Sequence, residues 1–476
     1  MRLRRAGKRT EKIVGAAAVA VVLLSGSSYW VGSRVEQGFR ERIDWVAEQG
    51  VTVSVVDYQR GVFGATARTD VILQIPSLED PSVTESVTVP FIHSIRHGPF
   101  PALTASARIH SEAQLAEDGI AYLNEIFGTD PFEGKAPLVF DTVIGWAGGR
   151  HSRIVSPKFE ALIKEDQTKV SWGGLNGEVV MDADLTHQEM RVVINSLSFI
   201  KNDDDFFRLG RVILEGNMTL AKGLGRVYSG TTGIMLDKFH MRGKSDNGAL
   251  RSVEFENFRV TGDASVKDGT LNTEVRFNAD RIITEGETKE TADDLKLTFL
   301  LENIDAKAYD VILQTMHEDQ TQEMTTVLQE QGVILLQRKP VLIIKDASGR
   351  WPEGVATGNF RIAFVGDANP ENLSISSLSG NLQLELPRAL VTRHISSQVF
   401  VEIADSLEDG EEHEVNVGNE TTEQVSKQMA AMFEKGIFVE KGDTLTVDAH
   451  LQDGELKLNG KQQPIETLFE LLPPFF

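Results

Sequence analysis

The chain has 476 residues and contains no cysteine. That absence excludes disulfides, thiolate zinc sites, iron–sulfur clusters and cysteine nucleophiles together. The sequence also lacks G-x-S-x-G and H-E-x-x-H, the patterns that place a serine nucleophile or a pair of zinc ligands. No cofactor is therefore expected. For an exported protein, the lack of disulfides would fit a bacterial periplasm better than a eukaryotic secretory route.

Positive charge is scarce outside the N-terminal tail. The formal net charge is −22. Residues 1–12 hold six basic residues against Glu11, a balance of +5, so the rest of the chain carries −27. So acidic a body argues against nucleic acid as a partner.

One long apolar run is present, from Ile13 to Val31, and it contains no charged residue. As a helix it would span roughly 28 Å, close to the bilayer's hydrocarbon thickness of about 30 Å. The basic tail ahead of it should stay in the cytoplasm, which predicts a single-pass anchor in the inner membrane with a periplasmic body. The alternative is a cleaved signal peptide, although no clean A-x-A site follows and apolar character resumes at Tyr29-Trp30-Val31.

Residues 35–49 are predicted to form a juxtamembrane amphipathic helix, because Val35, Phe39, Ile43 and Val46 recur at helical spacing. We expect this helix to pack on the body, with pairing to a second copy as the alternative. Alternating apolar residues then predict a hairpin of two strands with its turn at Gln59-Arg60-Gly61.

The remaining chain is predicted to form a β-rich body over 51–301, followed by a helix-and-strand part over 302–476. Short alternating runs, among them Gly233 to Arg242 and Val253 to Thr261, are separated by turn residues and indicate a large antiparallel sheet. Asn303 is predicted to cap a helix, and Asp453-Gly454 a hairpin turn. The predicted fold class is α+β, predominantly antiparallel β, with several amphipathic helices.

Four segments together resemble a known family. These are the anchor with Tyr58, Arg60, Gly61 and Phe63 after it, the strand that closes on His97-Gly98-Pro99, the region around Asn303, and the segment with Asp453, Gly454, Asn459 and Gly460. They are similar to the YdgA-like family of bacterial inner-membrane-anchored proteins of unknown function. The resemblance covers nearly the whole length and implies location and architecture, but no reaction.

Neither histidines nor acidic runs predict a metal site. His93 and His97 would lie about 13 Å apart on one face of a strand, too far to share an ion, so we interpret them as structural. Asp203-Asp204-Asp205 lacks the ligand pattern of a calcium loop and is interpreted as a solvated turn.

Three functions remain open. The first is a non-enzymatic envelope scaffold or homodimer, since open sheets must cover or pair their edges. The second is a carrier of lipid or another hydrophobic ligand in a groove of a curved sheet. The third is a hydrolase whose site is not visible in the sequence. An apolar groove left uncovered by helices would favour the carrier, and a filled core would favour the scaffold.

The predicted topology can be tested with alkaline phosphatase fused after Phe476. Because that enzyme is active only after export, we expect activity in the fusion and none from a cytoplasmic reporter at the same position. The reverse pattern would show that the orientation is wrong.

Overall fold

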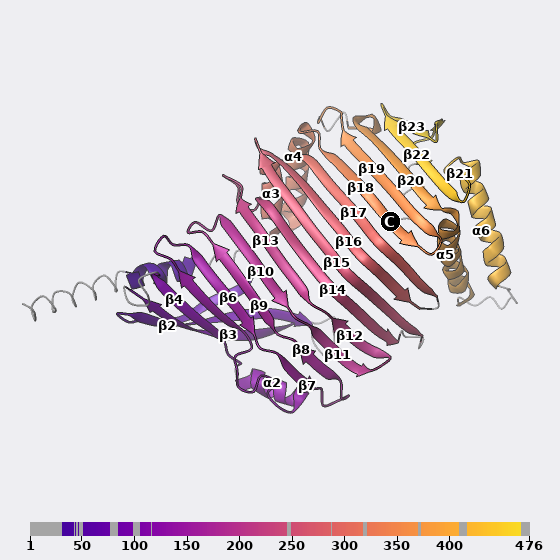
Figure 1. The fold of residues 1–476 in the computed structure, drawn as a ribbon. Helices are drawn as coiled ribbons and strands as arrows, with labels where there is room; N and C mark the ends of the chain where they lie inside the picture. The colour runs from indigo at the N-terminus through magenta and orange to yellow at the C-terminus, as the bar shows by residue number, and fades with distance from the viewer. Residues whose placement is uncertain are drawn as a thin grey trace, which may run out of the picture. The chain divides into compact units, whose positions relative to one another are not determined.

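The structure is a computed structural model that describes residues 31–41, 43, 46, 51–76, 84–98, 105–115, 117–244, 249–286, 288–317, 321–369, 373–408 and 417–467. The chain divides into two compact units, Met1–Thr219 and Leu220–Phe476. Each is built on long antiparallel strands (Figure 1).

Unit 1 holds two runs of paired strands and helix α2 (Glu117–Phe127). The longer run has the order β1–β2–β3–β4–β5–β6–β9–β10–β13, and every pair is antiparallel. Its strands are β1 (Thr52–Arg60), β2 (Gly64–Pro76), β3 (Thr84–His97), β4 (Ala107–Ala113), β5 (Val139–Ile144), β6 (Arg150–Ser156), β9 (Leu175–Met181), β10 (His187–Ile194) and β13 (Val212–Leu220). The shorter run, β7–β8–β11–β12, comprises β7 (Phe159–Leu162), β8 (Lys169–Trp172), β11 (Leu197–Asn202) and β12 (Asp205–Leu209).

Unit 2 is one antiparallel sheet in the order β14–β15–β16–β17–β18–β19–β20–β22–β23–β24, with β21 also paired to β22. Its strands are β14 (Tyr228–Lys244), β15 (Leu250–Lys267), β16 (Thr270–Glu285), β17 (Lys289–Asp305), β18 (Val341–Trp351), β19 (Gly354–Phe364), β20 (Leu378–Pro387), β21 (Val439–Lys441), β22 (Thr444–Gln452), β23 (Glu455–Leu458) and β24 (Lys461–Gln463). Its helices are α3 (Ala306–His317), α4 (Thr321–Gln337), α5 (Arg388–Glu408) and α6 (Val417–Glu434), with a 3₁₀ turn, η2, at Ile375–Ser377.

The predicted class, an antiparallel β architecture with helices, is confirmed. The predicted strands were too short, since β14 and β15 run for 17 and 18 residues. The prediction that Asn303 caps a helix is wrong. Asn303 still belongs to β17, and α3 begins at Ala306 because the Asp305 carboxylate accepts hydrogen bonds from the backbone N–H of Lys307 and Ala308 at 3.2 and 3.0 Å.

The predicted anchor over residues 13–31 lies outside the described residues except for Val31. Among the residues that the structure does describe, no helix is both long enough and apolar enough to cross a membrane.

The chain is already helical over residues 31–41, four residues earlier than predicted. Val31, Val35 and Phe39, spaced four apart, form the buried stripe of this helix. The stripe packs against small and aliphatic side chains of β2, β3 and β4, namely Ala65, Ala67, Ile95, Ala107 and Ile109. The helix therefore packs on the strands of unit 1, because small residues there leave room for its larger side chains.

A buried histidine lies beneath this helix. The His93 ring packs edge-on against Phe39, with ring centroids 5.0 Å apart. Its Nε2 lies 2.9 Å from the Thr69 hydroxyl and its Nδ1 lies 2.7 Å from the Ser111 hydroxyl. The side chain is 6% exposed, and burial lowers the pKa of His93 to about 4. The imidazole is therefore neutral at pH 7 and hydrogen bonded at both nitrogens.

This histidine should make the stability of unit 1 depend on pH. Its folded pKa lies below the unfolded value of about 6.5, so between those two pH values the unfolded chain binds a proton that the folded chain does not. Stability should be complete above pH 6.5 and fall by on the order of 3 kcal/mol as the pH drops through this window. Urea unfolding from pH 7 to pH 4 measures it, and His93→Gln should flatten the dependence. An unchanged slope in that variant would assign the effect to other groups.

Candidate functional site

A groove of about 1150 Å³ lies in unit 2. We call it the unit 2 groove. Strands β15 to β20 form its floor and helix α5 forms one wall. The lining is mainly aliphatic and aromatic: Phe258, Phe277, Ala279, Ile282, Leu295, Leu297, Ile344, Ala347, Trp351, Ala356, Phe360, Leu382, Leu384, Leu386, Leu390 and Val391. This volume exceeds the 300 to 1,000 Å³ typical of pockets for drug-sized ligands.

The register of the strands explains why these side chains share one face. Phe277 on β16 pairs with Leu297 on β17. Ile344 on β18 pairs with Phe360 on β19, which pairs in turn with Leu382 on β20. Directly paired residues point to the same side of a sheet, so they form continuous apolar rows across the strands. These rows are the floor of the groove.

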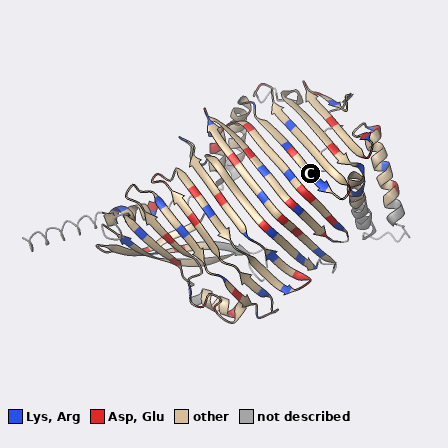
Figure 2. Cartoon of the chain, viewed as in Figure 1, with Lys and Arg blue, Asp and Glu red and all other residues tan. Residues whose placement is uncertain are grey.

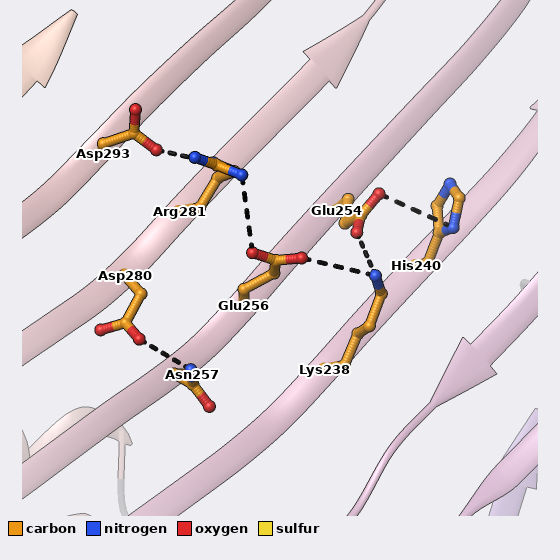
Figure 3. A network of polar contacts seen from close by, with 8 residues as sticks. All are labelled: Lys238, His240, Glu254, Glu256, Asn257, Asp280, Arg281 and Asp293. Atoms are coloured by element: carbon orange, nitrogen blue, oxygen red, sulfur yellow. Dashed lines mark hydrogen bonds and ion pairs between the residues drawn. The ribbon is translucent and has the colours of Figure 1, made fainter.

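The opposite face of unit 2 is polar and charged. Lys238 on β14 forms ion pairs with Glu254 and Glu256 on β15. Arg281 on β16 lies 4.0 Å from Glu256 and 2.6 Å from Asp293 on β17 (Figure 3). Figure 2 shows such residues of both signs along the long strands. Exposed pairs contribute about 0–1 kcal/mol each, so their main effect is to keep this face in water.

Helices cover only parts of the apolar face. At one end of the long strands, α3 and α4 pack there through a cluster that includes Leu271, Ile304 and Leu335. Near β20 and β22, α5 and α6 form the largest core cluster, with Ile395 and Val425 among its buried residues. The groove occupies the stretch of the apolar face between these two helix pairs.

Charged side chains gather at one end of the groove. Arg393 on α5 lies between two carboxylates, with its Nη1 3.0 Å from Glu290 on β17 and its Nε 2.9 Å from Glu353 in the β18–β19 turn. Trp351, two residues before Glu353, also lines the groove. The groove is therefore amphipathic, with a long apolar floor and one polar end.

The part of the chain that the structure describes contains no group of three or more His, Asp or Glu side chains arranged to hold a metal ion. His93 has hydroxyl partners at both ring nitrogens, and both partners lie on strands of the buried core.

None of the described family-motif residues lines the groove. In unit 1, three of them contact helix 31–41. Tyr58 packs against Phe39 with ring centroids 5.7 Å apart, and Arg60 Nη1 lies 3.2 Å from Glu36 Oε2. His97 is 1% exposed and lies against Gly32, which has no side chain to displace it. These motif residues hold the helix on the sheet.

The other motif residues of unit 1 shape the strand ends. Gly61 and Phe63 form the β1–β2 turn, where the Gly61 N–H donates to the Gly64 carbonyl at 2.7 Å and the His97 N–H donates to the Phe63 carbonyl at 3.1 Å. Gly98 follows β3 with φ +97°, a value that favours glycine. Pro99 lies outside the described residues.

The remaining motif residues serve turns in unit 2. Asp453 and Gly454, at φ +52° and +79°, form the predicted hairpin turn between β22 and β23. Asn459, which precedes Gly460 between β23 and β24, donates from Nδ2 to the carbonyls of Gly436 and Ile437 at 2.8 and 2.9 Å. It thereby ties the end of α6 to the C-terminal strands.

Asn303 has φ +62° within β17, and its backbone N–H donates to Asn272 Oδ1 at 3.0 Å. The structure therefore brings Tyr58, Arg60 and His97 together beneath one helix, whereas Asn303 and the C-terminal turn residues are separate from that cluster.

Sequence reasoning did not identify the groove residues. The alternation of apolar residues along β15 did carry a signal for the groove face. Its apolar side chains on that face are Val253, Phe255, Phe258 and Val260. The step from 255 to 258 is three residues and not two, because Asn257 has a left-handed backbone with φ +51°, while the pairing with β14 and β16 stays in register across it. This residue interrupts the period-two pattern, which hides a single long strand.

The packing of helix 31–41 can be tested at two of its glycines. A Cβ at Gly32 would lie 2.4 Å from the His97 ring, whereas one at Gly38 would meet nothing closer than 3.8 Å. We expect Gly32→Ala to destabilise unit 1 by about 1–3 kcal/mol through overpacking. Gly38→Ala should stabilise it by about 0.5–1 kcal/mol through helix propensity. Thermal unfolding of the two variants measures this, and equal shifts would contradict the described contact.

Comparison with known proteins agrees with the resemblance found in the sequence. Residues 8–466 match the family model described as "Bacterial protein of unknown function (DUF945)". The chain is also 21% identical to Protein YdgA of Escherichia coli (strain K12) over 500 residues, covering 95% of this chain and 94% of that protein. No solved structure matches. The resemblance to the YdgA-like family is thus confirmed, and the chain belongs to the DUF945 family of bacterial proteins of unknown function.

Proposed function

We propose that this protein is a carrier of an amphipathic lipid, whose acyl chains lie in the unit 2 groove. The observation that supports the proposal is the apolar floor across β15 to β20, which lies between the two helix pairs and has a volume of about 1150 Å³. Of the two non-enzymatic functions considered from the sequence, a scaffold would require only a filled core. A groove of this size favours a carrier.

The energetics of an acyl chain in this groove are favourable. Each methylene group that leaves water for an apolar surface gains about 0.8 kcal/mol. The sheet face alone offers Phe277, Leu297, Ile344, Phe360 and Leu384 as contacts. A small polar metabolite could not use this floor, because it would lose its hydration without gaining hydrogen bonds there.

We further propose that residues 13–31 anchor the protein in the bacterial inner membrane, with the bulk of the chain in the periplasm. Helix 31–41 follows that segment directly and packs on unit 1. The anchor would thereby hold the body at the membrane from which the lipid leaves. A homodimer remains the alternative arrangement, because the apolar face also exposes Ile234 and Met241 on β14.

A groove-blocking variant tests the carrier function. Ala347 lines the groove on β18, so Ala347→Trp should fill part of it and reduce the lipid that co-purifies with the full-length protein by severalfold. Ile343 pairs with Arg361 and is adjacent to Ile344, which lines the groove, so Ile343 points to the opposite face. The register shift between Ile344 and Ala347 explains why two residues four apart face opposite sides, and Ile343→Trp is the matched control. Mass spectrometry of the extracted lipid gives the ratio of lipid to protein.

The expected result is a full complement of lipid in the wild type and in Ile343→Trp, and a depleted complement in Ala347→Trp. Thermal unfolding should show that both variants are folded. Equal lipid in all three folded proteins would contradict binding in the groove.

A further inference from the structure

The charged end of the groove combines residues from three elements: Glu290 from β17, Glu353 from the β18–β19 turn and Arg393 from α5. The side chain of Glu353 is 20% exposed, that of Arg393 30% and that of Glu290 44%. Glu290 and Arg393 line the groove, whereas Glu353 contacts Arg393 from outside the lining. Glu290 is therefore the more accessible of the two carboxylates.

The charges of this cluster do not cancel. One guanidinium is shared by two carboxylates, which leaves a net charge of −1. Two other ionisable residues border the groove. Lys296 is one of the lining residues, but it alternates with Leu295 and Leu297 on β17 and pairs with Asn278 on β16, so the alternation directs its side chain to the face opposite theirs. His394 also lines the groove, and its Nε2 lies 3.2 Å from Gln398 Nε2. The excess negative charge therefore lies at Glu290, at the polar end of an apolar groove.

This arrangement discriminates between headgroups. A purely anionic head would meet the excess carboxylate and would have to take Arg393 from partners that already bind it, which costs affinity. An ammonium group would instead form an ion pair with Glu290. Aromatic rings also favour ammonium groups, and Trp351 lines the same end of the groove.

We propose that the Glu290 end of the unit 2 groove receives the ammonium headgroup of a phospholipid whose acyl chains lie along the groove floor. The inference rests on the carrier function proposed above and specifies the class of lipid. Arg393 and Glu353 are positioning residues in this account, because they hold Glu290 and the first turns of α5 together at the groove end.

The test uses the full-length protein with a photo-crosslinking amino acid at Leu297 in the groove. It is reconstituted into vesicles of equal parts phosphatidylethanolamine, which carries an ammonium group, and phosphatidylglycerol, which does not. After irradiation, mass spectrometry gives the ratio of the two lipids in the adducts. We expect phosphatidylethanolamine to be enriched about threefold, which is the effect of one partly exposed ion pair.

Glu290→Gln should remove this enrichment without removing the adducts, because the apolar floor is unchanged. Glu256→Gln is the matched control, since it removes one carboxylate from the opposite face and should keep the enrichment. Adducts in the vesicle ratio, or an enrichment that survives Glu290→Gln, would overturn the headgroup inference and leave the carrier standing. An absence of lipid adducts at Leu297 would overturn the carrier function itself.

Discussion

The structure depends on the alternation of side chains along very long strands. A strand of 18 residues such as β15 extends for about 60 Å, whereas a helix of 21 residues such as α5 extends for about 32 Å. The helix pairs α3–α4 and α5–α6 therefore cover only part of the apolar face of unit 2. The uncovered part between them is the groove, so the groove follows from the difference in length between strands and helices.

In unit 1, a helix covers part of an antiparallel sheet. There, helix 31–41 covers a patch of small side chains, and Tyr58, Arg60 and His97 fix it in place. These contacts give the motif residues Tyr58, Arg60 and His97 a packing role. They attach the segment that follows the predicted anchor to the sheet, which is a mechanical task.

Much of this could be predicted from the sequence, including the antiparallel class, the amphipathic stripe of Val35 and Phe39, and the turn at Asp453-Gly454. Strand lengths could not be predicted, because residues with a left-handed backbone, such as Asn257, interrupt the period-two pattern. The start of α3 was misplaced because Asn303 and Asp305 are both good caps, and only the pairing of Ile304 and Asp305 with β16 extends β17 past Asn303. The groove end was not predicted, since Glu290, Glu353 and Arg393 are distant in sequence and meet only through the strand order.

The central claim is that one face of the unit 2 sheet binds lipid and the other does not. The most direct measurement places a photo-crosslinking amino acid at neighbouring residues of three strands in the full-length protein. The account predicts lipid adducts at Ile282, Leu297 and Ile344, whose side chains line the groove. It predicts none at the adjacent Ile283, Thr298 and Ile343, which face the opposite side. Adducts at both sets, or at neither, would contradict it.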